Sequence, residues 1–131
     1  SLYTRMDQSE NDEELALMQT ELVDRFGPLP NAVNDLFMTI RCRRIAISLG
    51  FEKMTLKDET LRCFFVNRPD SPYFESETFK QLLDYAQKNM NKAHFKQVGR
   101  SFILIIKEVK SMQHCYTTLE KIHIGVFPVE V

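Results

Sequence analysis

The amino-acid sequence predicts an α+β domain in which helices pack with a small antiparallel sheet of two hairpins, in the order ααββαββα. Four segments have apolar residues at the three- and four-residue spacing of amphipathic helices. Two other regions each contain a pair of short runs rich in β-branched and aromatic residues, separated by turn-forming residues. The chain has 131 residues, of which 44% are hydrophobic, and this is enough for one packed core.

The first helix is predicted to begin after Asn11 and to end near Phe26. Asn11 is a favourable N-cap, and the acidic residues 12–14 suit the positive end of the helix dipole. One side of this helix carries the apolar residues Leu15, Met18, Leu22 and Phe26. A different side carries Glu14, Leu17, Glu21 and Asp24. We therefore expect Leu17 to be exposed between carboxylates, and residues 1–10 to be an arm or the end of a preceding helix.

Two glycines are predicted to end the first two helices. Gly27 can take the left-handed conformation of a helix C-terminus, and Pro28 cannot continue the helix. Gly50 is expected to end the second helix in the same way.

The second helix is predicted to start at Pro30 or Asn31 and to run to Leu49. Its apolar stripe consists of Val33, Leu36, Phe37, Ile40 and Ile47. Arg44 falls within that stripe, so its side chain must either reach solvent or pair with an acidic residue.

Two hairpins follow from the change of period after residue 50. The predicted strands are residues 51–57, 61–66, 94–98 and 101–107. The turns that join them are Asp58-Glu59-Thr60 and Gly99-Arg100. Residues 102–106 are apolar throughout, which is typical of a central strand.

The third and last helices are predicted to begin after Ser76 and Ser111, both of which are good N-caps. The third helix carries the apolar set Phe79, Leu82, Leu83, Ala86 and Met90. The last carries the inward set Met112, Cys115, Tyr116, Leu119, Ile122 and His123, and Gly125 is expected to end it. The domain is therefore placed at residues 11–125, followed by a tail at 126–131.

Composition narrows the class of protein. The formal net charge of −1 excludes a global positive field for nucleic acid, so any such contact must be local. The absence of a long apolar run and of a secretory pattern predicts a cytoplasmic protein. Three well-separated cysteines favour reduced core thiols. A chain that begins at Ser1 rather than Met is expected to be a fragment of a longer protein.

No constellation in the sequence favours catalysis, a metal or a cofactor. The four glycines are too far apart for a phosphate-binding loop. The adjacent His114 and Cys115 lack a second ligand pair, and neither Cys42 nor Cys63 has a base near it in sequence. We expect the fragment to have no enzymatic activity and no cofactor of its own.

The most specific segment is Glu21-Leu22-Val23-Asp24-Arg25-Phe26-Gly27-Pro28-Leu29-Pro30, and the long helix after it ends at Gly50. In residue order and spacing it resembles the acidic-Leu-x-Asp-Arg-Phe-Gly-x-Leu-Pro segment that opens the C-terminal domain of bacterial transcription-repair coupling factors. A lead-in of Leu2-Tyr3-x-Arg5-Met6 extends the resemblance toward the start of the chain. The resembled parent is an ATP-dependent DNA translocase that dislodges stalled RNA polymerase and recruits nucleotide excision repair proteins.

The resemblance implies an autoinhibitory role for this domain. In that family the domain packs on an amino-terminal module similar to the excinuclease protein UvrB and masks the surface that binds the excinuclease protein UvrA. The family's acidic pair, here Glu21 and Asp24, faces arginines of that module. Arg25 and Phe26 would fix the turn, with Gly27, Pro30 and Gly50 as structural positions of the motif.

Physical reasoning from the residues leaves two interpretations of the first helix open. Leu17 within the carboxylates Glu14, Glu21 and Asp24 suits an arginine-bearing partner surface, although acidic helix faces are commonly just solvated.

The alternative function is an accessory nucleic-acid-binding domain that uses Arg41, Arg43, Lys88 and Lys92. The predicted helix positions spread these cations, and direct DNA contact is not the favoured interpretation.

Overall fold

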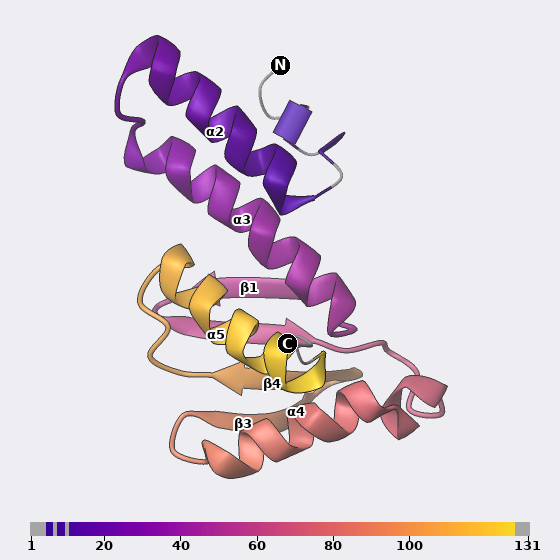
Figure 1. The fold of residues 1–131 in the computed structure, drawn as a ribbon. Helices are drawn as coiled ribbons and strands as arrows, with labels where there is room; N and C mark the ends of the chain where they lie inside the picture. Colours follow the sequence, from indigo (N-terminus) through magenta and orange to yellow (C-terminus); the bar gives the residue numbers. More distant parts are fainter. Residues whose placement is uncertain (1–4, 7, 10, 128–131) are drawn as a thin grey trace.

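The computed structural model describes residues 5, 6, 8, 9 and 11–127 (Figure 1). Its elements are α2 (Asp12–Phe26), α3 (Asn31–Ser48), β1 (Lys53–Lys57), β2 (Thr60–Phe64), the 3-10 helix η1 (Pro72–Glu75), α4 (Glu77–Lys88), β3 (Ala93–Val98), β4 (Ser101–Ile106) and α5 (Met112–Val126). The predicted α+β class and the order ααββαββα are confirmed. Of the predicted arm, Arg5, Met6 and Gln8 are helical. The predicted tail begins inside α5, and its last four residues lie outside the described part.

The two hairpins form one antiparallel sheet with the strand order β1-β2-β4-β3. β2 pairs with β4, so the hairpins are joined through their inner strands and β4 is central, as its apolar run predicts. The first turn is shorter than expected, because Thr60 already pairs with Lys57. Asp58 and Glu59 both have positive φ, 51° and 59°, which is the geometry of a two-residue type I′ hairpin.

The main core lies between one face of the sheet and the helices α3, α4 and α5 (Figure 1). From the sheet it contains Leu61, Cys63, Ala93, Leu104 and Ile106. From the helices it contains Cys42, Ile45, Ala46, Leu49, Phe79, Leu82, Ala86, Cys115, Leu119 and Ile122. The predicted apolar sets of the third and last helices are therefore partly confirmed, since Phe79, Leu82, Ala86, Cys115, Leu119 and Ile122 are buried.

A second, smaller core lies between α2 and α3. Its buried members are Met6, Leu15, Met18, Phe37 and Ile40. α3 is thus apolar on two sides, with α2 against one side and the sheet and α5 against the other. The α2–α3 pair stands above the sheet in Figure 1, and Met6, from the segment before α2, also packs into this core.

Several residues of the predicted apolar stripes are exposed instead, and two of them, Phe26 and Ile47, share one physical reason. Phe26, the last residue of α2, is 73% exposed, and Ile47 on α3 is 66% exposed. Both lie on the apolar side of their helix but at its end, where the antiparallel partner helix stops. Asp12, the first residue of α2, pairs with Arg44, so Ile47 is almost a full turn beyond the reach of α2. Leu36 on α3 and Leu83 on α4 also belong to predicted apolar sets, and both are exposed.

The predicted helix ends need two corrections, at α5 and at α4. Gly50 ends α3 as expected: its φ is 87°, and the Phe51 amide donates to the Ala46 carbonyl at 2.9 Å in the six-to-one bond of a Schellman motif. Gly125 does not end α5, because the helix continues to Val126. α4 also ends at Lys88, before the exposed Met90.

Candidate protein interaction site

The acidic side of α2 is positioned by its N-cap. The side chain of Asn11 accepts a hydrogen bond from the Glu14 amide at 2.9 Å, and Asp12, Glu13 and Glu14 occupy the positive first turn. Leu15 and Met18 anchor the opposite side in the second core. The helix therefore presents its acidic side outward by the same periodicity that buries its apolar side.

The predicted site residues Glu14, Leu17, Glu21 and Asp24 are all exposed. Leu17 is 65% exposed, as its predicted position between the carboxylates requires. Glu13 adds to this surface, because it precedes Leu17 by four residues and is also exposed. Helical spacing alone could have identified it. We call Glu13, Glu14, Leu17, Glu21 and Asp24 the α2 surface.

Glu21 has a partner within the chain. Its Oε2 lies 3.5 Å from Arg5 Nη2, and the two side chains are 64% and 63% exposed. An ion pair this long and this hydrated contributes little stability, so a partner's arginine can replace it. A hollow of about 300 Å³ adjoins the pair and is lined by Arg5, Gln8, Ser9, Glu14, Leu17, Met18 and Glu21.

The turn after α2 depends on Gly27. Its φ of 77° and ψ of −164° lie in a region that is essentially restricted to glycine, and its amide donates to the Val23 carbonyl at 2.8 Å. Pro30 is the N-cap of α3, and its carbonyl accepts from the amides of Val33 and Asn34. Arg25 and Phe26 are exposed at this turn. The turn therefore rests on backbone geometry, and Phe26 is available at the surface.

The family model described as TRCF domain matches residues 1–76, which is more than half of the 131 residues. The chain belongs to the TRCF domain family. The transcription-repair-coupling factor of Borreliella burgdorferi (strain ATCC 35210 / DSM 4680 / CIP 102532 / B31) is 25% identical over 114 residues, which cover 83% of this chain and 10% of that protein. The chain thus spans about a tenth of the length of this curated relative. The family expected from residues 21–30 is confirmed.

Arg44 of the TRCF domain has a partner that the sequence could not identify. Its Nη1 donates to Asp12 Oδ1 at 3.0 Å, and its Nη2 donates to the carbonyl and the hydroxyl of Ser9. The guanidinium therefore ties the start of α2 and the segment before it to the middle of α3. Of the two predicted options, pairing with an acidic residue is the one observed.

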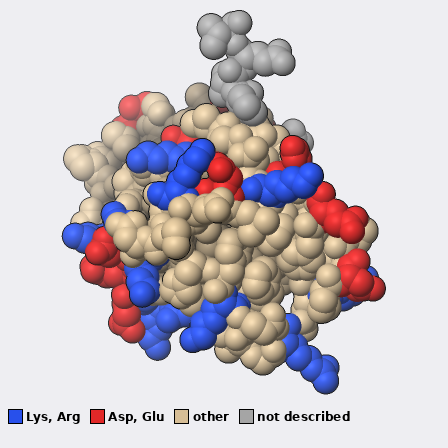
Figure 2. Space-filling view, turned by 90° about the horizontal axis from the view of Figure 1, so that it is seen from below, with Lys and Arg blue, Asp and Glu red and all other residues tan. Residues whose placement is uncertain are grey.

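The cations of the alternative nucleic-acid hypothesis do not form one patch. Arg41 donates to Gln19 at 2.9 Å on α2, Lys88 pairs with Asp84 at 2.9 Å, and Lys92 pairs with Glu108 at 3.4 Å. Figure 2 views the molecule from below and shows Lys and Arg mixed with Asp and Glu around the edge of that face. Of the predicted set, Arg41 and Arg43 lie on α3, whereas Lys88 lies at the end of α4 and Lys92 just before β3.

In the TRCF domain the three cysteines are buried together in the main core, and His114 lies apart from them at the surface. His114 is exposed and its Nδ1 accepts from the Lys110 amide at 3.2 Å, whereas the neighbouring Cys115 is buried in the main core. Burial raises the pKa of the Cys63 thiol, and a hydrogen bond with Cys115 together with burial raises that of Cys42. Among the described residues no group of three potential ligands is close enough to hold a metal ion.

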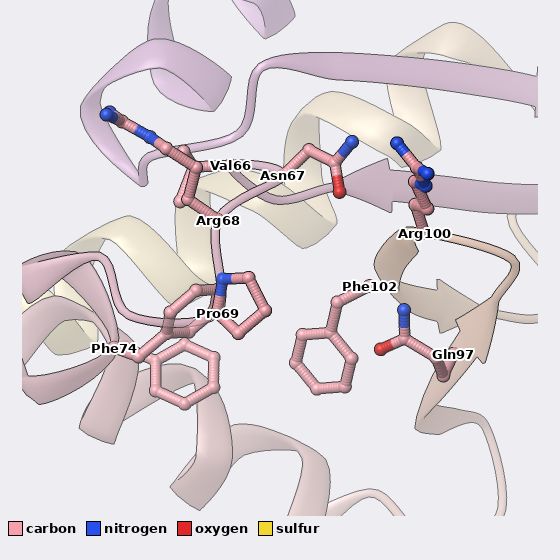
Figure 3. A pocket seen from close by; sticks show the side chains of 9 residues that line it. Val66, Asn67, Arg68, Pro69, Phe74, Gln97, Arg100 and Phe102 are labelled. Carbon is pink, nitrogen blue, oxygen red and sulfur yellow. The ribbon is translucent and has the colours of Figure 1, made fainter.

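One apolar cavity of about 300 Å³ lies at the end of the sheet (Figure 3). Its rings come from Phe74, Phe79 and Phe102, with Pro69 beside them. Figure 3 shows the side chain of Arg68 directed away from these rings. Asn67, Gln97 and Arg100 also line the cavity, so its wall combines these rings with polar side chains. None of the described helices is long and apolar enough to span a membrane.

Proposed function

We propose that this TRCF domain is an autoinhibitory interaction domain of an ATP-dependent DNA translocase that couples transcription to nucleotide excision repair. Its α2 surface docks on arginines of an amino-terminal module that resembles the excinuclease protein UvrB, within the same polypeptide. Docking masks the surface that recruits the excinuclease protein UvrA and so controls how the parent engages repair proteins and RNA polymerase. The domain itself carries out no chemistry, needs no cofactor, and acts in the cytoplasm.

The observation that carries the proposal is the outward presentation of the acidic motif. Glu21 and Asp24 are both exposed although they belong to the helix that anchors the second core. Within the described residues Asp24 forms no ion pair, and Glu21 has only the long, hydrated contact with Arg5. Two carboxylates on one helix face are a suitable target for the planar guanidinium of arginine.

The same geometry supports a contact that can open. Leu17 gives the surface one exposed apolar side chain, and the remainder is charged. Such an interface depends on several modest ion pairs, each weakened by water and salt. A domain held in this way can be released when the parent changes conformation, and this suits a regulatory contact.

The test is isothermal titration calorimetry of the 131-residue chain against the separate amino-terminal module. We expect the double variant Glu21→Arg, Asp24→Arg to weaken binding by at least about tenfold, because two attractive contacts become repulsive. The matched control is Asp70→Arg with Glu75→Arg, which changes the net charge equally at two exposed positions outside α2. The control should bind like the unmodified chain.

A third variant tests whether the internal contact of Glu21 competes with docking. Arg5→Ala removes the internal partner of Glu21, so binding should stay equal or become tighter. The proposal is wrong if the α2 double variant and the control bind equally well. It is also wrong if Arg5→Ala abolishes binding while the α2 double variant does not.

A further inference from the structure

The sheet has a second face that no helix of the described chain covers. The residues of the main core alternate along the strands, and all lie on the face toward α3, α4 and α5. In Figure 1 α5 crosses in front of the strands on that side. Ile103 and Ile105 point the other way: they are buried, yet they belong to neither core. They mark the centre of a face over which no helix of the described chain lies.

The strand register defines this open face row by row. The first row is Lys53, Phe64, Ile103 and Lys96, and the second is Thr55, Arg62, Ile105 and His94. Beyond them the Lys107 amide donates to the Lys92 carbonyl at 2.8 Å, which extends the pairing by one step. Lys57, opposite Thr60, completes that end of the face. Long basic side chains flank Ile103 and Ile105, so their stems can cover these isoleucines while the charges remain in water.

The charge on the open face has one sign. Its Lys and Arg residues are Lys53, Lys57, Arg62, Lys92, Lys96 and Lys107, and the four strands contain no Asp or Glu. Carboxylates occur only on flanking segments, at Glu52, Asp58, Glu59 and Glu108. In the described chain Lys92 is the member of this set that forms an ion pair, with Glu108. A chain with a net charge of −1 therefore separates its charges between faces.

The type of partner follows from what the face lacks. A protein interface is normally anchored by an exposed apolar side chain that enters a pocket. Here Ile103 and Ile105 are already buried, Phe64 lies under Lys53 with the ammonium 5.1 Å from the ring centre, and Val98 at the edge is the exposed apolar residue. The affinity of such a face must come from charge that is spread over the strands. A phosphate backbone offers the matching, evenly charged surface.

We propose that the open face of the sheet binds the phosphate backbone of nucleic acid without reading its sequence. The site shares no residue with the α2 surface, and apart from Lys92 it differs from the cations of the alternative hypothesis. It does not depend on the autoinhibitory function, and either can fail alone.

The test is fluorescence anisotropy of a labelled DNA duplex, with single-stranded DNA of the same sequence as a second probe, titrated with the 131-residue chain. Binding should weaken steeply between about 50 and 200 mM salt, because each phosphate contact releases counterions. The triple variant Lys53→Glu, Arg62→Glu, Lys96→Glu should weaken binding at least about tenfold. Its salt dependence should lose about one unit of logarithmic slope per contact removed.

The matched control reverses three exposed cations elsewhere: Arg25→Glu, Lys110→Glu and Lys121→Glu. It changes net charge by the same amount, and it should keep binding within about threefold, since only long-range charge is altered. A neutralising triple, Lys53→Gln, Arg62→Gln and Lys96→Gln, guards against misfolding and should show a smaller loss of DNA affinity. Circular dichroism verifies that each variant is folded.

Two results would overturn the proposal. One is an equal loss of DNA affinity in the sheet-face triple and the control triple, which would show that binding depends only on the net charge of the chain. The other is a chain that binds polyglutamate at low salt but neither DNA probe, which would assign the face to an acidic protein.

Discussion

At the scale of single residues, Gly50 is fixed by both its backbone and its surroundings. Its φ is 87°, and a Cβ at this position would lie 2.2 Å from Cε1 of Tyr73. The hydroxyl of Tyr73 donates to the Leu49 carbonyl at 2.6 Å, so the ring cannot easily move away. Gly50→Ala should therefore lower the free energy of unfolding by about 2–4 kcal/mol, from backbone strain plus overpacking. Urea denaturation would measure this.

Two other glycines serve as controls for that prediction. Gly99 also has positive φ, 59°, but a Cβ there would meet nothing within 4 Å, so Gly99→Ala should cost only about 1 kcal/mol. Gly125 lies within α5 in open space, and Gly125→Ala should stabilise the domain by about 0.5–1 kcal/mol. Equal effects at positions 50 and 99 would show that the contact with Tyr73 is unimportant.

At the scale of elements, the sequence predicts the helix starts and strand pairs, because local residues determine them. The N-caps Asn11, Ser76 and Ser111 each accept the expected backbone hydrogen bond, and the strand pairs occur where the two-residue period begins. Prediction from sequence fails where the packing of neighbouring elements decides which apolar residues are buried. Phe26 has the right periodicity for burial, but the packing partner of α2 ends there. One apolar stripe was assigned to α3, whereas the helix has two buried sides.

The separate second core predicts that α2 opens independently of the sheet. Leu15→Ala removes a fully buried side chain from that core and should cost about 2–5 kcal/mol. Because Leu15 does not belong to the main core, the loss should appear mainly as faster amide exchange in α2. The amides of β4, the central strand, should stay protected.

Hydrogen exchange with mass spectrometry can measure both regions in one experiment. The comparison variant is Leu119→Ala, which removes a fully buried side chain from the main core. It should speed exchange in β4 as well as in the helices. If Leu15→Ala accelerated exchange equally in α2 and β4, the two cores would form one cooperative unit.

At the scale of the whole molecule, the acidic and the basic surface differ in how far sequence could predict them. The carboxylates of α2 are close in sequence, so helical periodicity alone brings Glu21 and Asp24 onto one face. The cations of the open sheet face come from four strands, and Lys53 and Lys96 share a row only because β2 pairs with β4. Alternation within one strand indicates a face, but no local signal specifies the strand order. The basic surface could therefore be identified only from the strand order in the structure.

Three half-buried tyrosines limit the stability of the whole domain at alkaline pH. Burial raises the pKa of Tyr73 and of Tyr85, and burial with a hydrogen bond to Glu120 raises that of Tyr116 to about 12. In the unfolded chain a tyrosine ionises near pH 10. Above that pH the unfolded state loses protons that the folded state retains, so the free energy of unfolding must fall as pH rises. Below about pH 10 the contribution of these groups to stability does not change with pH.

The variant Tyr73→Phe isolates one of these tyrosines. It loses the hydrogen bond to the Leu49 carbonyl, so it should be less stable than the unmodified chain at pH 8. It also lacks the ionisable hydroxyl, so the difference in free energy of unfolding should narrow as pH rises above about 10. Urea denaturation curves of both proteins at intervals from about pH 8 to 11 would measure that difference. A constant difference would mean that the Tyr73 hydroxyl ionises equally readily in the folded and unfolded states, and a widening one that it ionises more readily in the folded state. Either result would contradict the raised pKa.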